Sequence, residues 1–113
     1  MLLILCTDLI FSTRITGTAK ALEVPYAVAR SKEALAEKLS VGGIARVILD
    51  LNIATLDPIE ALQTIKAQAP QLTVIAFLSH VQVELAQQAR DHGADQVMPR
   101  STFVAQLPAL LKP

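Results

Sequence analysis

The sequence predicts an α/β fold, a five-stranded parallel sheet covered by helices on both faces in a three-layer sandwich. Two observations support this prediction. Five short segments are continuous apolar runs, as in strands buried on both sides, rather than alternating apolar and polar residues. Segments with helical spacing and capping residues separate them, so that strands and helices alternate along the chain. At 113 residues, the chain is expected to form one domain over 1–113.

The composition excludes several classes of protein. Hydrophobic residues make up 52% of the chain and only four of them are Phe or Tyr, so the core should be aliphatic. Ten basic residues balance ten acidic ones, which gives no electrostatic reason to expect nucleic acid or an anionic membrane as partner. The apolar run at 1–6 is too short to span a membrane. The single cysteine, Cys6, cannot form an internal disulfide and is expected to be a small buried residue, so a cytoplasmic location is expected.

The strands are predicted from the apolar runs. They cover 2–6, 24–29, 45–49, 72–77 and 95–98. Pro25 near the start of the second run suits an edge strand, because proline lacks the N–H that a central strand donates. Asp50 follows the third run directly. In an open parallel α/β sheet, ligands bind beyond the carboxyl ends of the strands, so Asp50 is expected at the functional rim.

The helices are predicted from spacing and capping residues. They cover 9–22, 32–40, 58–68, 83–92 and 102–111. Ser31 is a suitable N-cap for the second helix, and Asp57 and Pro58 form a strong start for the third. Gly93 closes the fourth helix in the position of a left-handed cap. Ser101 is expected to cap the last helix, which should kink or break near Pro108.

Three local motifs in this order resemble the CheY-like receiver domain of response regulators. They are Val-Ile-Leu-Asp-Leu-Asn at 47–52, Asp-Pro at 57–58 and Gly-Ala-Asp at 93–95. The resemblance covers the whole chain and implies the flavodoxin-like strand order 2-1-3-4-5. It also implies a phosphoryl group accepted from a histidine kinase by Asp50, with magnesium bound by Asp50, the backbone carbonyl of Asn52 and an acidic pair after the first strand.

Other positions depart from the pattern of the family. The acidic pair is Thr7-Asp8, so Asp8 is the one remaining carboxylate and magnesium is expected to bind weakly. Arg100 replaces the lysine that contacts the phosphoryl group, and its planar fork differs from an ammonium.

The family's hydroxyl and aromatic positions are aliphatic here. Leu78 stands where the family has Thr or Ser, and Ser79 comes one residue late. It would reach the phosphate only after a register shift, because one step turns a strand side chain to the other face. Val97 replaces the aromatic residue. The two positions that couple phosphorylation to shape in the family are therefore both changed.

These departures predict a degenerate receiver, or pseudo-receiver, that is not an enzyme and binds a protein partner, either a histidine kinase or a downstream regulator. A homodimer through the fourth helix, fifth strand and fifth helix is a further expectation. The residues proposed for that face are Val83, Ala86, Val97, Val104 and Leu107. The alternative is a working phosphoacceptor that uses Asp50, Asp8, Asn52 and Arg100. A small flavodoxin-like cofactor binder has less support, because no glycine-rich phosphate loop follows the first strand.

Structural roles compete with these functional ones. The structural alternative for Asp8 is an N-cap of the first helix, and for Arg100 it is an ion-paired surface residue. For Asp50 it is a strand end that caps nearby amides, which its context favours less than the functional role. His80 is expected at the functional rim, but a single histidine without a second His or Cys nearby is a poor metal site.

Overall fold

The computed structural model describes residues 1–79 and 82–112, and within them five parallel strands form one sheet in the order β2-β1-β3-β4-β5. The strands are β1 (Leu2–Leu5), β2 (Tyr26–Val28), β3 (Arg46–Asp50), β4 (Thr73–Leu78) and β5 (Gln96–Pro99). Every pair of neighbouring strands is parallel. The predicted α/β class and the flavodoxin-like order 2-1-3-4-5 are confirmed.

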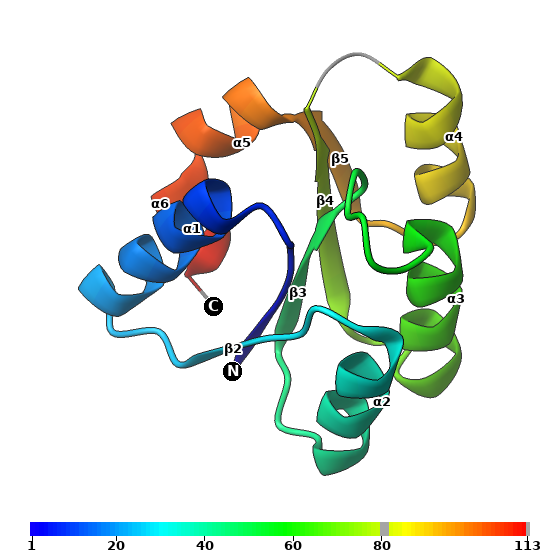
Figure 1. Cartoon of the computed structure of the whole chain (residues 1–113), viewed down its shortest axis with the longest axis horizontal. Helices are drawn as coiled ribbons and strands as arrows, with labels where there is room; N and C mark the ends of the chain where they lie inside the picture. Colours follow the sequence, from blue (N-terminus) through cyan, green and yellow to red (C-terminus); the bar gives the residue numbers. More distant parts are fainter. Residues whose placement is uncertain (80–81, 113) are drawn as a thin grey trace.

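The helices lie in two layers, one on each face of the sheet (Figure 1). They are α1 (Leu9–Ala21), α2 (Lys32–Val41), α3 (Pro58–Gln68), α4 (Val83–Asp91), α5 (Arg100–Ala105) and α6 (Leu107–Leu111). Helices α1, α5 and α6 cover one face, and α2, α3 and α4 cover the other. No helix in the two described ranges is long and apolar enough to cross a membrane.

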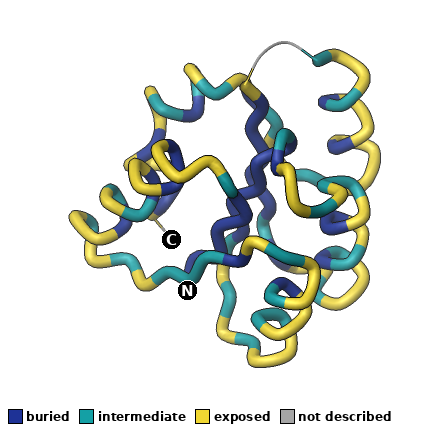
Figure 2. Tube along the Cα trace, in the orientation of Figure 1, coloured by how far each residue is buried: buried dark blue, intermediate teal, exposed yellow. Residues whose placement is uncertain are grey.

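The central strands are buried from both sides, as their continuous apolar sequences predict (Figure 2). Leu3 and Val47 point to one side and join the core under α2, α3 and α4. Ile4 and Ile48 point to the other side and join the core under α1, α5 and α6. Each such side chain contributes about 1.5–3 kcal/mol when fully buried, and the two cores together hold the strand ends in fixed positions.

Capping residues set the helix boundaries as predicted. The Ser31 hydroxyl accepts a 3.0 Å hydrogen bond from the Ala34 N–H at the start of α2. Asp57 accepts two backbone N–H groups in the first turn of α3, where Pro58 occupies the first helical position. Gly93 follows α4 with φ +102°, which an L side chain adopts only with strain.

The last helix differs from the prediction at its start. Helix α5 begins at Arg100, directly after Pro99 ends β5, so Pro99 is its N-cap and Ser101 lies inside the helix. The expectation that Ser101 caps this helix is wrong, because the strand continues one residue further and leaves no space for a loop. The expected break is confirmed: α5 ends at Ala105, Gln106 separates it from α6, and Pro108 lies in the first turn of α6, where proline is tolerated.

The edge strand β2 is shorter than predicted. It covers Tyr26–Val28 instead of 24–29 and lies at the edge of the sheet. Pro25 precedes it, and the Pro25 carbonyl accepts a 2.9 Å hydrogen bond from the Leu2 N–H. Pro25 therefore still contacts β1, but only through its carbonyl. Proline has no backbone N–H, so it can accept a hydrogen bond from the backbone but cannot donate one.

Candidate functional site

Asp50 is the last residue of β3 and is almost completely buried, with 2% of its surface exposed. The Asn52 N–H donates a 2.8 Å hydrogen bond to Asp50 Oδ1. The Cys6 thiol lies 3.6 Å from Asp50 Oδ2. Cys6 follows the end of β1, which pairs with β3 in parallel, so the two strands deliver the thiol and the carboxylate to the same rim.

This environment shifts both ionisable groups toward their neutral forms. Burial is the main cause that raises the pKa of Asp50, and the Asn52 N–H and the Arg100 charge oppose it only in part. Burial, followed by the Asp50 charge, raises the pKa of the Cys6 thiol to about 11. Cys6 is buried as predicted, and its contact with Asp50 was not predicted.

Asp8 has two roles at the start of α1. Its Oδ1 accepts a 3.0 Å hydrogen bond from the Phe11 N–H, so the predicted N-cap is present. Its Oδ2 accepts a 3.3 Å hydrogen bond from Arg100 Nη1. The Phe11 N–H lowers the pKa of Asp8, burial opposes this, and Arg100 lowers it further. Asp8 is therefore the more readily ionised of the two carboxyl groups.

Arg100 lies between the two carboxylates. Its Nη1 is 3.3 Å from Asp8 Oδ2, and its Nη2 is 3.8 Å from Asp50 Oδ2. The second distance is that of an ion pair rather than a hydrogen bond. As the first residue of α5, Arg100 lies at the carboxyl end of β5, which brings it to the rim that Asp50 occupies. We call Asp8, Asp50 and Arg100 the rim ion cluster.

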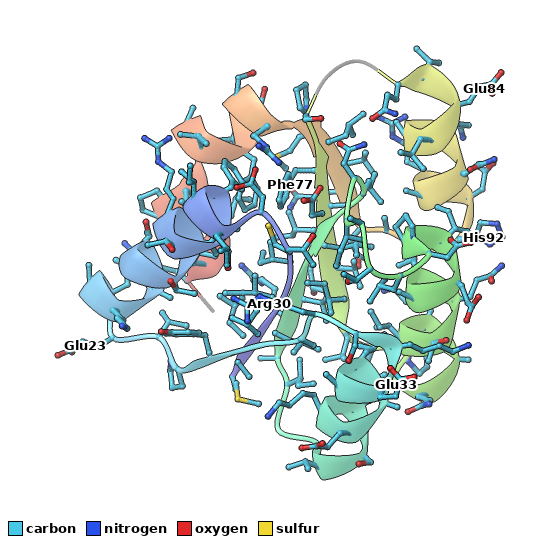
Figure 3. All side chains as sticks on the ribbon, viewed as in Figure 1. Glu23, Arg30, Glu33, Phe77, Glu84 and His92 are labelled. Carbon is cyan, nitrogen blue, oxygen red and sulfur yellow. The ribbon has the colours of Figure 1, made fainter. Side chains whose placement is uncertain are left out.

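Aromatic rings hold the Arg100 guanidinium in place. Its Cζ lies 4.1 Å from the centroid of the Phe11 ring and 5.6 Å from that of Phe77. Phe77 belongs to the core between the sheet and the layer of α1, α5 and α6 (Figure 3), and its ring stacks on Phe103 at 4.6 Å. Within 1–79 and 82–112, no group forms a hydrogen bond with the buried Arg100 Nε, so only the terminal nitrogens of the guanidinium contact the carboxylates.

The residues at the hydroxyl position face different environments. Leu78 is buried, with 4% of its surface exposed, and packs in the core under α2, α3 and α4. Ser79 is exposed, and both its N–H and its Oγ donate hydrogen bonds to Asn52 Oδ1, at 2.7 and 3.0 Å. The Ser79 hydroxyl is therefore bound to the Asn52 side chain. Val97 is partly buried against the same core as Leu78.

The Asn52 side chain connects two loops of the rim. Besides accepting from Ser79, its Nδ2 donates a 2.7 Å hydrogen bond to Gln82 Oε1. Gln82 is the residue before α4, and its side chain makes no capping hydrogen bond to that helix. The sequence pattern pointed only to the backbone carbonyl of Asn52. The signal that could indicate a role for its side chain is the pair of amide residues, Asn52 and Gln82, in the loops that follow the neighbouring strands β3 and β4. His80 lies outside the described residues.

Comparison with known proteins identifies the family. Residues 10–112 match the family model described as the response regulator receiver domain. The chain belongs to this family. Receiver domains are signalling modules of two-component systems, and they bind divalent cations at the phosphorylation site. No curated protein matches the chain by sequence.

Solved structures support the same fold. The chain is similar to a response regulator protein from Burkholderia pseudomallei, solved with a phosphorylated aspartic acid, a calcium ion and citrate (TM-score 0.85, 14% identity); the match covers 98% of this chain and 65% of that one. It is also similar to the receiver domain of NtrX from Brucella abortus (TM-score 0.83, 21% identity, 95% and 91% covered). A third is the signal receiver domain of a DNA-binding response regulator from Colwellia psychrerythraea 34H (TM-score 0.81, 18% identity, 99% and 98% covered). This receiver domain thus spans about 65% of the Burkholderia chain.

The cation site of this receiver domain is limited by its own charges. No group of three or more His, Cys, Asp or Glu residues within 1–79 and 82–112 is arranged to hold a metal ion. Asp8 and Asp50 offer carboxylate oxygens of the kind that magnesium prefers. The Arg100 guanidinium is paired with both, so a divalent cation would have to replace it.

The face of α4, β5 and α5 is less apolar at its surface than expected. Val83 is 73% exposed, and Val97 and Val104 are half-buried. Ala86 and Leu107 are buried, because Ala86 packs on the core beneath α4 and Leu107 packs on the core beneath α6. Leu107 therefore does not contribute to a surface patch as expected, and Ala86 contributes only as a lining residue of a groove. A groove of about 180 Å³ does open on this side of the receiver domain. It is lined by Leu78, Gln82, Val83, Ala86, Arg90, Met98 and Pro99.

Proposed function

We propose that this receiver domain is an atypical signalling module that acts through contact with a protein partner. In this proposal, Arg100 neutralises Asp8 and Asp50 in place of a divalent cation, and phosphorylation of Asp50 is not required. The observation that carries the proposal is the position of the guanidinium, which lies within 3.8 Å of Asp50 and 3.3 Å of Asp8.

The charges of the rim ion cluster support this reading. A transferring phosphoryl group brings negative charge to a carboxylate, and a cation must compensate that charge. Here the only cation of the cluster already pairs with two carboxylates, and its guanidinium rests on the Phe11 ring. Moving Arg100 to a phosphoryl group would break the ion pairs, the hydrogen bond to Asp8 and the aromatic contact together.

The buried position of Leu78 supports it as well. A phosphoryl group on Asp50 would meet no hydroxyl from Leu78, which lies in the core, while the Ser79 hydroxyl is bound to Asn52. A response to phosphorylation at the end of β4 would require Ser79 to release Asn52 and turn toward Asp50.

A working phosphoacceptor is the second candidate function. It is favoured by the arrangement of Asp50, Asp8 and Arg100 on one rim, next to the Asn52 backbone. Magnesium, when bound, would supply the charge compensation that Arg100 supplies here. In this alternative, Asp8 and Asp50 would hold the cation, and Arg100 would leave the two carboxylates and contact the phosphoryl oxygens.

The partner in either case is expected to be a histidine kinase or a downstream regulator. Self-association is a separate expectation for the face of α4, β5 and α5, where Val83 is exposed next to the groove. Sedimentation of the domain over a range of concentrations tests it. A monomer at all concentrations would exclude the homodimer and leave the heterologous partner.

Titration with magnesium and beryllofluoride, followed by amide chemical shifts, separates the two candidate functions. The wild-type domain is expected to show no saturable shift of the Asn52 and Ser79 amides at millimolar magnesium. A saturable, magnesium-dependent shift that disappears in Asp50→Asn would overturn the proposal and establish the phosphoacceptor. Arg100→Lys is the matched variant. It keeps the charge but lacks the planar fork that pairs two carboxylates, and it is expected to gain a magnesium response.

A further inference from the structure

We propose that the Asn52 side chain is a positioning residue that links Asp50 to the start of α4. It would carry a change at Asp50 to the groove beside that helix. This inference rests on the proposed function, in which the hydroxyl and aromatic positions of the family, now Leu78 and Val97, no longer provide that link.

The link consists of short hydrogen bonds. Asp50 Oδ1 accepts the Asn52 N–H at 2.8 Å, and Asn52 Nδ2 donates to Gln82 Oε1 at 2.7 Å. Asn52 Oδ1 accepts the Ser79 N–H at 2.7 Å. Since a backbone N–H only donates, Oδ1 must face Ser79, and this leaves Nδ2 to face Gln82. The network therefore fixes the orientation of the Asn52 amide, which the heavy-atom positions alone would leave ambiguous.

Gln82 is well placed to receive this signal. It directly precedes α4, and its side chain makes no hydrogen bond to the helix. Its contact with Asn52 therefore holds the start of α4 to the loop after β3. Gln82 also lines the groove together with Leu78 and Val83. A shift of Gln82 would change the shape of that groove.

Asp50 is able to move Asn52 because its carboxylate accepts the Asn52 N–H. Hydrogen bonds to a charged acceptor are shorter and stronger than those to a neutral one. The substitution Asp50→Asn replaces the carboxylate by a neutral acceptor, which weakens this bond and releases the backbone at Asn52. The Asn52 side chain then shifts relative to Gln82.

A second connection between the site and β4 serves as an internal control. The Leu51 N–H donates a 2.9 Å hydrogen bond to the Phe77 carbonyl, as part of the pairing of β3 with β4. This backbone contact does not involve the Gln82 side chain. The Leu51–Phe77 hydrogen bond is expected to remain in every variant of Gln82. The α4 chemical-shift change that persists in those variants therefore measures the part transmitted through β4.

The test compares amide chemical shifts of the wild-type domain and Asp50→Asn, with and without substitutions at Gln82. Asp50→Asn alone is expected to shift the amides of Val83 and Ala86. In the Gln82→Ala background, more than half of that shift should be lost. Gln82→Glu should restore it, because its carboxylate accepts the same hydrogen bond from Asn52. The amide of Leu35 in α2, whose N–H donates to the Ser31 carbonyl, is the reference.

An undiminished α4 shift in Gln82→Ala would overturn the inference, and so would a loss that Gln82→Glu fails to restore. Urea unfolding midpoints for each variant establish that the domains compared are folded. The measurement uses no magnesium and no beryllofluoride. A positive magnesium response would therefore overturn the proposed function while this result stands or falls separately.

Discussion

The guanidinium of Arg100 lies 4.1 Å from the centroid of the Phe11 ring, so the cation that pairs with Asp8 and Asp50 rests on an aromatic face. The same Phe11 contributes the backbone N–H that Asp8 accepts. One residue of α1 thus positions both an anion and the cation of the rim ion cluster. This double contact leads to the first prediction.

A double-mutant cycle of Phe11→Leu and Arg100→Gln should reveal coupling between the two side chains. The expected coupling energy is about 0.5–1 kcal/mol, as for a partly desolvated cation on an aromatic face. Urea unfolding of the four proteins at neutral pH measures it. If the losses of stability are strictly additive, the coupling energy is zero, and the contact between the ring and the guanidinium does not stabilise the domain.

Asp50→Asn should be more stable than the wild-type domain at neutral pH. The pKa of Asp50 is raised in the folded state, mainly by burial, so the folded domain binds a proton more readily than the unfolded chain does. Charged Asp50 therefore lowers the free energy of unfolding above its folded pKa. That loss is recovered as the pH falls through the raised pKa toward the unfolded value of about 3.9.

Denaturation of wild type and Asp50→Asn across this pH range tests the sign. The advantage of Asp50→Asn should shrink on acidification and vanish below both pKa values. An advantage that grows on acidification would mean that the Arg100 ion pair outweighs burial at Asp50.

Gly93→Ala should destabilise the domain by about 1–3 kcal/mol, because it places a side chain at a strained positive φ. Gly93 has φ +102°, and an added Cβ would lie 3.2 Å from Lys66 Cγ. Gly17→Ala in α1 is the matched control, since its added Cβ would meet nothing within 4 Å. There alanine should stabilise the helix by about 0.5–1 kcal/mol. Thermal unfolding compares the two, and changes of the same sign would contradict the assignment.

Leu78→Thr and Arg100→Lys together should restore a response to magnesium and beryllofluoride that neither the wild type nor Leu78→Thr alone shows. The double variant returns a hydroxyl to the end of β4 and removes the guanidinium that pairs with both carboxylates. Leu78→Thr should cost about 2–3 kcal/mol, because a buried side chain is lost and a hydroxyl replaces it. The titration is therefore run at a temperature well below the thermal unfolding midpoint of the double variant. A response from Leu78→Thr alone would show that Arg100 is no obstacle.

The sequence predicts the sheet and most helix boundaries because their causes are local. Continuous aliphatic runs mark β1 and β3, and Ser31 and Asp57 mark helix starts whose hydrogen bonds the structure contains. Ser101 lies inside α5 and does not cap it, because the preference of serine for caps is weaker than the tertiary pairing of β5, which extends to Pro99. Local propensity yields to such pairing when the two compete.

The sequence predicts which residues of the candidate site reach the rim, because these residues follow the carboxyl ends of the strands. The pattern brings Asp8, Asp50 and Arg100 to one rim, and the structure places them together. Their distances depend on rotamers, which no spacing in the sequence encodes. The contact of Phe11 with Arg100 joins helices α1 and α5, and that of Asn52 with Gln82 joins the loops after β3 and β4. Both depend on the packing of segments far apart in the chain, so the sequence pattern predicts neither contact.

Cys6 provides a built-in probe of this rim. Its thiol is fully shielded, and its pKa of about 11 keeps it protonated at neutral pH, whereas the thiolate is the reactive form. An alkylating reagent should therefore modify the native domain only during moments when the ends of β1 and β3 separate. The rate of alkylation then reports how often the rim opens. Comparing this rate between variants ranks the effect of each substitution on rim opening, and no isotope labelling is needed.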